Sequence, residues 1–245
     1  MALSAHSDPA SLPRRSFAYR KLVAAGAGFE AVNGAATAMD FGDPEAESAV
    51  ARRLGLADLS PLPRTGFKGA GTADWLAGQG LAVPDRSNRA QRQADGLLAA
   101  RLAPGELLIL GGLDGDAGPV DRLDRAWQDA PIPPETPRGF PVPRAHTNAW
   151  YRLSGSAAPA MFAKLCGVDL RTHKFTDLDI AQTQIARISG IIIRDDLGTG
   201  DAAVPAFHLV FDSASAAYLW DCLIDAMAEF DGGLVGLSAL RAVSA

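Results

Sequence analysis

The residues of this chain that could do chemistry are four histidines, two cysteines and two pairs of aspartates. The histidines lie far apart, and none has another histidine or a cysteine at metal-ligand spacing. They are His6, His146, His173 and His208. The sequence contains no HxxxH, HExxH or CxxC pattern. These spacings predict no metal-binding residue.

The aspartate pairs are Asp195 with Asp196, and Asp114 with Asp116. Paired carboxylates can bind a cation or act as acid and base. Both pairs lie in glycine-rich segments, where an aspartate side chain commonly bonds the backbone of a turn, and we interpret them as turn residues. His208 stands in an apolar strand pattern, which favours a histidine on the polar face, or one whose hydrogen bonds are satisfied within the fold, over a catalytic histidine.

Nucleophile and phosphate-binding patterns are missing as well. Ser154 in LSGS and Ser189 in RISG lack the GxSxG context of an activated serine. The segment GAGFEAVNG at 26–34 lacks the third small residue of GxGxxG, so a loop or a strand and turn is predicted there. We therefore assign no catalytic and no cofactor-binding residue to this chain.

Composition narrows the class of partner and compartment. The chain has 245 residues, 48% of them hydrophobic, and a net charge of -5. An acidic chain without clustered Lys and Arg is not typical of a nucleic-acid binder. No apolar run reaches the ~20 residues that span a bilayer, and the start lacks a signal-peptide pattern, so a cytoplasmic protein without a membrane partner is expected. Cys166 and Cys222 lie in apolar helical patterns and are expected to be buried free thiols.

The strands and helices that must position these residues are predicted to follow the same order in two segments of the chain. In 146–230, a strand at 150–153 precedes a helix that Ser156 caps and Gly167 ends. Strands at 182–194 and 207–211 follow, and a helix opens at Ser213. In 58–127, a strand ending near Gly69, a helix capped by Thr72, two strands around 104–105 and a helix at 119–127 repeat the order. We predict an α+β fold in which two ferredoxin-like β-α-β-β-α halves form one pseudo-symmetric domain.

The chain then divides into four parts. Residues 1–57 form an arm, either mobile or laid on another surface, followed by a short helix at 44–56 with acidic residues early and basic residues late. Residues 58–130 and 145–245 are the two halves. Residues 131–144 are a proline-rich connector, either wrapped on a surface or freely exposed.

Residues 55–232 resemble the gamma subunit of heterotetrameric sarcosine oxidase. The resemblance is carried by LADLSPLPRTGFKG, DGLLAARLAPGELLIL, KLCGVDLR, AQTQIARISGIIIRDD, AFHLVFD and AYLWDCLIDAMAEF in that order and spacing. The LADLS segment ahead of a strand is also similar to the start of the folate-binding glycine-cleavage T-protein domain. The chain departs from the family in its amino-terminal arm, its connector and an inserted GDAAVP at 200–205.

The resemblance implies a non-catalytic structural subunit that holds no cofactor. In such complexes the alpha subunit carries NAD and tetrahydrofolate sites, FAD and FMN are bound by the beta subunit and at the alpha–beta contact, and the delta subunit holds zinc. The complex oxidises the N-methyl group of sarcosine to give glycine and passes the one-carbon unit to tetrahydrofolate. The implied partners are alpha, beta and delta subunits. The alternative function is a free-standing folate-binding or aminomethyltransferase-like protein.

A subunit role predicts surface residues that contact a partner. The candidate contacts combine exposed apolar side chains of the arm and connector with basic rim residues. They are Phe17, Tyr19, Arg64, Lys68, Phe140 and Val142. Arg187 and Arg194, near the aliphatic strand, are interpreted as solvated charges, with a partner-facing role as the alternative.

Overall fold

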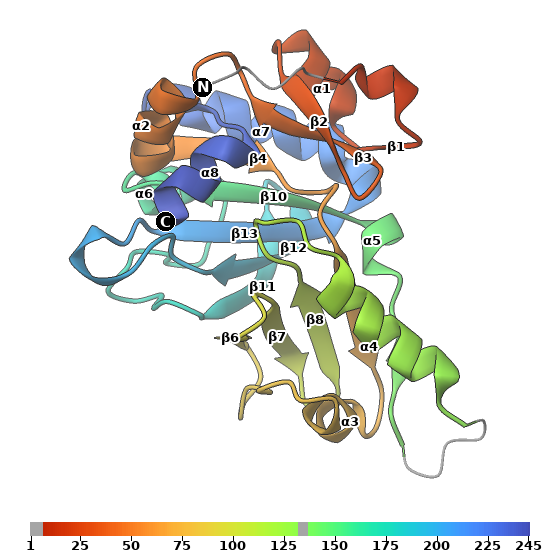
Figure 1. The fold of residues 1–245 in the computed structure, drawn as a ribbon. Coiled ribbons are helices and arrows are strands. Elements are labelled where there is room, and N and C mark those ends of the chain that lie inside the picture. Colours follow the sequence, from red (N-terminus) through yellow and green to blue (C-terminus); the bar gives the residue numbers. More distant parts are fainter. Residues whose placement is uncertain (1–6, 132–136) are drawn as a thin grey trace.

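Three β-sheets and their covering helices make up the described part of the chain (Figure 1). The computed structural model describes residues 7–131 and 137–245. The largest sheet has six strands, in the order β11 (Ile180–Ile185), β12 (Ile188–Arg194), β13 (Ala206–Asp212), β10 (Asn148–Ser154), β4 (Gly55–Asp58) and β14 (Gly233–Leu234). The second has five, in the order β6 (Arg89–Arg92), β7 (Leu98–Ala103), β8 (Glu106–Leu110), β5 (Arg64–Lys68) and β9 (Phe140–Pro141).

The third sheet has the order β1 (Arg14–Arg15), β3 (Ala35–Asp40) and β2 (Gly28–Val32). The α-helices are α1 (Tyr19–Ala24), α2 (Pro44–Leu54), α3 (Thr72–Gly78), α4 (Gly118–Asp129), α5 (Arg144–Thr147), α6 (Ala158–Phe162), α7 (Ala216–Ala228) and α8 (Leu237–Ser244). Short 3-10 helices lie at η1 (Pro9–Ser11), η2 (Gly200–Ala202) and η3 (Ser213–Ser215). Within the described ranges, no helix is both long and apolar enough to cross a bilayer.

Two segments share one element order, but with one strand more than the sequence predicted. Each has a strand, a helix, three strands and a helix, namely β5-α3-β6-β7-β8-α4 and β10-α6-β11-β12-β13-α7. Their strands also share one neighbour order, β6-β7-β8-β5 and β11-β12-β13-β10. The observed order is therefore β-α-β-β-β-α rather than the expected β-α-β-β-α.

The additional strand of the second segment arises from a hairpin turn that its residue types do not signal. The run expected as a single strand at 182–194 is broken by Ala186 and Arg187, with φ of 47° and 70°. Both lie in the left-handed region, which tight hairpin turns require and which Asn-Gly or Gly usually supplies. β11 and β12 consequently pair as antiparallel neighbours from Ile180↔Ile193 to Ile185↔Ile188.

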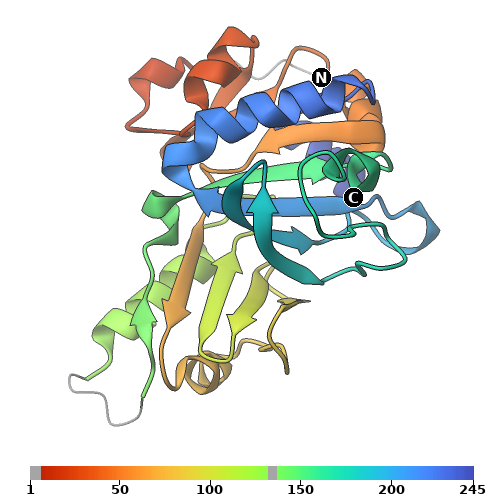
Figure 2. The same ribbon diagram turned by 180° about the vertical axis from the view of Figure 1, so that it is seen from behind.

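Side-chain alternation on β10 separates two cores. Tyr151 and Leu153 point to one face and pack with α6, α7 and the N-terminal elements. Trp150 points to the other face and shares a core with α8 and with Leu98 and Leu108 of the five-stranded sheet. Figure 2 shows α7 lying across the first of these faces. The two sheets thus meet through one apolar layer.

A third core covers the far face of the five-stranded sheet. Phe67, Leu107 and Ile109 from its strands contact Leu76 of α3 and Leu123 of α4. The predicted helix at 119–127 corresponds to α4. The layers therefore run from α3 and α4, through the two sheets, to α6 and α7.

Residues 7–54 form more ordered structure than an arm with a short helix. The GAGFEAVNG segment is a strand and turn, because β2 and β3 are joined at Asn33 and Gly34 with φ of 50° and 72°. Ser16 is buried and donates its hydroxyl to Asp58, which fixes the chain ahead of α1. The expected helix after 44 is confirmed as α2, where the Asp43 side chain accepts the Ala46 N–H at 3.0 Å. Residues 1–6 of the predicted arm lie outside the described residues.

Two helix starts differ from the predicted caps. Ser156 does not cap α6, whose N-cap position is Ala157, and α6 ends at Phe162 well before Gly167. Thr72 is the first residue of α3 instead of its cap, because Gly71 takes the cap position with φ of 75°. The helix expected from Ser213 begins as the 3-10 turn η3 and becomes α7 at Ala216.

The described part of the proline-rich connector lies along the edge of the five-stranded sheet. β9 pairs with β5, and the Val142 N–H donates to the Gly66 carbonyl at 2.7 Å. Arg138 is buried and donates to the Pro131 carbonyl at 2.9 Å. Residues 132–136 of the predicted connector lie outside the described residues.

Candidate functional site

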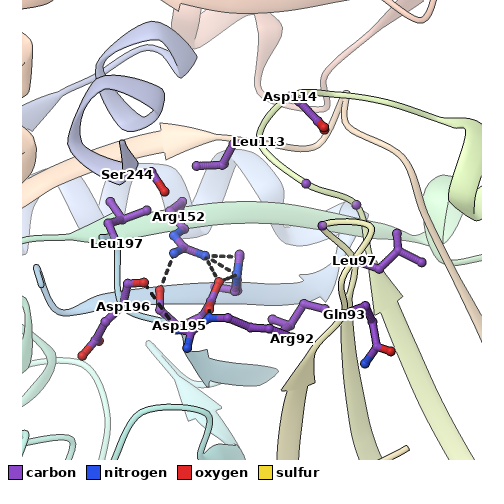
Figure 3. A pocket seen from close by; sticks show the side chains of 15 residues that line it. Arg92, Gln93, Leu97, Leu113, Asp114, Arg152, Asp195, Asp196, Leu197 and Ser244 are labelled. Atoms are coloured by element: carbon purple, nitrogen blue, oxygen red, sulfur yellow. Dashed lines mark hydrogen bonds and ion pairs between the residues drawn. The ribbon is translucent and has the colours of Figure 1, made fainter. Parts of the chain in front are cut away.

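A cavity of about 310 Å³ opens between the two large sheets. Its walls come from the start of β7, the loop after β8, the loop after β12, and the C-terminal end of α8 (Figure 3). Ionisable side chains line it in addition to leucines. These are Arg92, Asp114, Arg152, Asp195, Asp196 and His208.

His208 on β13 is buried and held in one tautomer. The Trp150 indole can only donate, so its hydrogen bond of 2.9 Å makes Nδ1 of His208 an acceptor. Nε2 then carries the proton and donates to Oδ2 of Asp195 at 3.0 Å. Burial, followed by the neighbouring Arg152 charge, lowers the pKa of His208 to about 4. His208 is therefore neutral at pH 7, and the predicted satisfied histidine is confirmed.

Arg152 on β10 is only 1% exposed and contacts both His208 and Asp195. Its guanidinium lies 3.2 Å from Oδ2 of Asp195 and also donates to the Asp195 carbonyl. Burial lowers the pKa of Arg152, and the Asp195 carboxylate opposes this shift. The buried cation thus depends on Asp195 as its counter-ion.

Asp195 follows β12 and joins Arg152 to Arg92 on β6. Arg92 Nε donates to Oδ1 of Asp195 at 2.7 Å, and its guanidinium is 2.9 Å from Asp177. Burial raises the pKa of Asp195, but the charges of Arg152 and Arg92 and the His208 hydrogen bond outweigh it and hold the pKa below its usual range. Asp195 is thus ionised and bound on both oxygens.

The neighbouring Asp196 serves a second ion pair. Arg194 donates to its two carboxylate oxygens at 2.8 and 2.6 Å, and also to the Thr172 and Phe175 carbonyls. Arg194 is 7% exposed, so the expected solvated position is wrong for this residue. It is buried because it satisfies the carbonyls of the loop before β11. Arg187, by contrast, is exposed on the β11–β12 turn.

The interpretation of Asp195 as a turn residue is therefore incomplete. Asp195 acts across the two sheets rather than in a turn alone, whereas turn chemistry is confirmed for Asp114 and Asp116, which accept the Asp116 and Gly118 amides. One signal could have found the network. Arg152 and His208 occupy inward-facing positions of two apolar strands, where a charged residue needs a partner.

The geometry of the network limits what it can do. A general base needs a lone pair directed at substrate, but Nδ1 of His208 accepts from Trp150 and both oxygens of Asp195 are bound. The arrangement stabilises and orients side chains. His146 and His173 lie elsewhere on the surface, and His6 lies outside the described residues. Among the described residues, no three His, Cys, Asp or Glu form a metal-binding group.

The cysteines differ in burial. Cys166 is 9% exposed and packs in the core beneath α6, as expected. Cys222 on α7 is half-buried, so the expectation of full burial holds for only one of the two. Both are free thiols.

Arg64, expected on a partner-contact rim, is buried within the chain. It is 3% exposed and donates to five backbone carbonyls. These belong to Ser60, Leu62, Arg144, Ala145 and Asn148. Burial lowers its pKa to about 10, against the opposing charge of Asp58. Arg64 anchors residues 144–148 to β5, and its buried side chain is not accessible to another protein.

The other five predicted contact residues form two groups. Lys68, Phe140 and Val142 come together where β9 pairs with β5, and Phe140 is 72% exposed. Trp127 holds one side of the Phe140 ring, with ring centroids 6.5 Å apart. Phe17, 41% exposed, and the half-buried Tyr19 lie near the start of α1.

No protein-family profile and no curated protein matches the chain, but solved structures do. A heterotetrameric sarcosine oxidase from Corynebacterium sp. U-96 in complex with pyrrole 2-carboxylate matches with a TM-score of 0.59 and 22% identity, covering 78% of this chain and 94% of that chain. The glycine cleavage system aminomethyltransferase T from Bartonella henselae matches with a TM-score of 0.69 and 15% identity. That match covers 94% of this chain and 62% of the aminomethyltransferase. The chain therefore has a mixed α/β, T-protein-like fold.

Proposed function

We propose that this chain is a non-catalytic, gamma-type structural subunit of a heterotetrameric amine-oxidising complex of the sarcosine oxidase kind. One observation carries the proposal: the fold is similar to 94% of a chain of a heterotetrameric sarcosine oxidase. Such a complex would oxidise sarcosine to glycine and transfer the one-carbon unit to tetrahydrofolate. Its FAD, FMN, NAD, tetrahydrofolate and zinc would be bound by alpha, beta and delta partners.

The charged cavity supports this role because its side chains already bind one another. Arg152 and Arg92 both form ion pairs with Asp195, and Arg194 forms one with Asp196. A network of matched charges stabilises the contact between two sheets without reserving a group for substrate. We also propose that the two segments with equal strand order are pseudo-symmetric halves of one scaffold.

The surface around Phe140 is the proposed contact with a partner subunit. Phe140 is the most exposed of the large hydrophobic residues described, and Trp127 and β5 hold the strand beneath it. Lys68 extends beside it, paired with Glu106 at 2.9 Å. An exposed aromatic with a polar rim is typical of an interaction centre.

Co-expression with the three partner chains, followed by size-exclusion chromatography, tests the role. Wild-type protein is expected to elute with all three partners. Phe140→Asp is expected to weaken co-elution, whereas the control Ile224→Asp, at an exposed position on α7, is not. Wild-type chain that elutes alone under every condition would overturn the subunit role.

A second candidate function is folate binding in the cavity between the sheets. It is favoured by the T-protein-like fold over 94% of the chain and by a cavity of about 310 Å³ that combines arginines with leucines. Tetrahydrofolate at about 100 times its dissociation constant would add ~2.7 kcal/mol to the free energy of unfolding. A thermal shift with tetrahydrofolate that Arg92→Met abolishes would favour this function, and no shift would remove it.

A further inference from the structure

A second cavity, of about 270 Å³, lies between β1, the loop after β4 and α5. We call it the Arg14 pocket. Two arginines, an aromatic side chain and a histidine line it, together with small and apolar residues. They include Arg14, Arg15, Phe17, Ser60, Pro61 and His146. Neither the network of Asp195 nor the Phe140 surface shares a residue with it.

The positive charge of this pocket is uncompensated within the described chain. Arg14 and Arg15 are exposed, and neither forms an ion pair with a described carboxylate. Arg15 instead places its guanidinium 5.2 Å from the centroid of the Tyr19 ring. The exposed Arg92 and Arg171 have carboxylate partners at 2.7 and 2.6 Å, whereas Arg86 and Arg187, which are exposed without an ion pair to a described carboxylate, do not line this pocket. In a chain of net charge -5, two unpaired arginines that line one cavity favour the binding of negative charge there.

The neighbouring buried charges increase this preference. Arg64 lies close enough for the Arg14 charge to lower its pKa, in addition to the larger effect of burial. Asp58 is 4% exposed and accepts the Ser16 hydroxyl and the Ser60 amide, the latter at 2.8 Å. Its carboxylate is therefore bound within the chain, and it forms no ion pair with Arg14 or Arg15.

The backbone presents the two arginines from a fixed position. β1 pairs in parallel with β3, with Arg14 opposite Ala35 and Arg15 opposite Ala36. Ser16, the next residue, is anchored to Asp58. A binding group on an ordered backbone loses little conformational entropy when it binds.

We propose that the Arg14 pocket receives an acidic segment of a protein partner. An Asp or Glu side chain of that segment binds Arg14 and Arg15, and a neighbouring apolar side chain packs on Phe17 and Pro61. The mixed lining favours a polypeptide over a free inorganic anion, because Phe17 is 41% exposed and offers nothing to an ion. This inference rests on the proposed subunit role and adds a second contact to it, with the chemistry of its partner.

Reconstitution from the purified chain and its three partner subunits tests the inference. The Arg14→Glu, Arg15→Glu double variant is expected to weaken assembly at least about tenfold and to flatten its dependence on salt. The control double variant Arg86→Glu, Arg187→Glu makes the same change of charge at exposed positions that do not line the pocket. It is expected to assemble within about twofold of wild type. Circular dichroism establishes that each variant folds. If the Arg14→Glu, Arg15→Glu variant does not fold, the Arg14→Gln, Arg15→Gln variant is used in its place.

The outcomes separate this inference from the proposed function. If wild-type chain assembles and the Arg14, Arg15 variant assembles equally with the same salt dependence, the inference is wrong and the subunit role stands. If the control variant loses as much affinity as the Arg14, Arg15 variant, the effect is one of net charge and the pocket is not the site. If wild-type chain fails to assemble, the subunit role itself is wrong.

Discussion

Trp150 donates its indole N–H to Nδ1 of His208 across 2.9 Å, between neighbouring strands of the six-stranded sheet. This bond is possible only while Nδ1 is unprotonated. Protonation of His208 would therefore break the contact and place a second positive charge beside Arg152. A single buried hydrogen bond between β10 and β13 thus makes the packing around Trp150 sensitive to pH.

The stability of the folded chain should decrease as the pH is lowered, because of His208. Its pKa is about 4 in the folded chain against an ordinary value of 6.5, so between these pH values the unfolded state binds a proton that the folded state does not. The free energy of unfolding has its full value above pH 6.5 and decreases by up to roughly 3 kcal/mol as the pH falls to 4. Urea unfolding at a series of pH values measures this. His208→Gln should flatten the profile between pH 6.5 and 4, and an unchanged slope would contradict the assignment.

Arg152 and Asp195 should be energetically coupled. Arg152→Met leaves Asp195 with one cation fewer in a buried site, and a loss of about 3 kcal/mol is expected. Because Asp195→Asn removes the same ion pair, the double variant should lose less than the sum of the two single losses. Urea unfolding of the four proteins gives the coupling energy. Arg187→Met, at an exposed turn, is the control and should change stability by less than about 0.5 kcal/mol. Additive losses would show that the pair does not interact.

Glu47 should hold α2 to the start of α8. It is 6% exposed, and its carboxylate accepts the Phe41 and Gly236 amides at 2.6 and 2.8 Å. Glu47→Ala leaves both amides without an acceptor, which should cost about 2–4 kcal/mol of unfolding free energy. Glu47→Gln keeps one acceptor and should lose less. The exposed Glu45 on the same helix provides the control, and an equal loss in Glu45→Ala would argue against this role.

Gly71 should be required where α3 meets the connector. Its φ is 75°, and a Cβ at this position would collide with the Pro137 carbonyl. Gly71→Ala should therefore destabilise the chain by more than about 1 kcal/mol. Gly78, at the end of the same helix, has open space around it, so Gly78→Ala should be neutral or stabilising by up to ~1 kcal/mol. Thermal unfolding of the two variants compares them, and equal melting temperatures would remove the steric argument.

Local patterns predicted much of the secondary structure. The alternation around Trp150 and His208 gave the central strands, and the charge order after Pro44 gave α2. The turn at Ala186 escaped prediction because neither it nor Arg187 is a typical left-handed residue.

Local sequence patterns could not predict the ion-pair network around Asp195 or the burial of the arginines. Arg92, Arg152 and Asp195 are 43 or more positions apart. Arg152 and Asp195 meet within the six-stranded sheet, and Arg92 joins them because the two sheets pack together. Arg64 reads as a polar surface residue by type, and only the path of 144–148 around it explains its burial. Sequence spacing does not encode a contact that depends on how two layers are placed.

Pro141 and Pro143 have a consequence for self-association. Since the Val142 amide points toward β5, the backbone nitrogens on either side of it face outward, and both belong to prolines without hydrogen. The rim of the five-stranded sheet consequently offers no donors there to template another strand, which protects it against fibre-like growth. The exposed aromatic ring of Phe140 can therefore lie on this edge without promoting polymerisation of the chain.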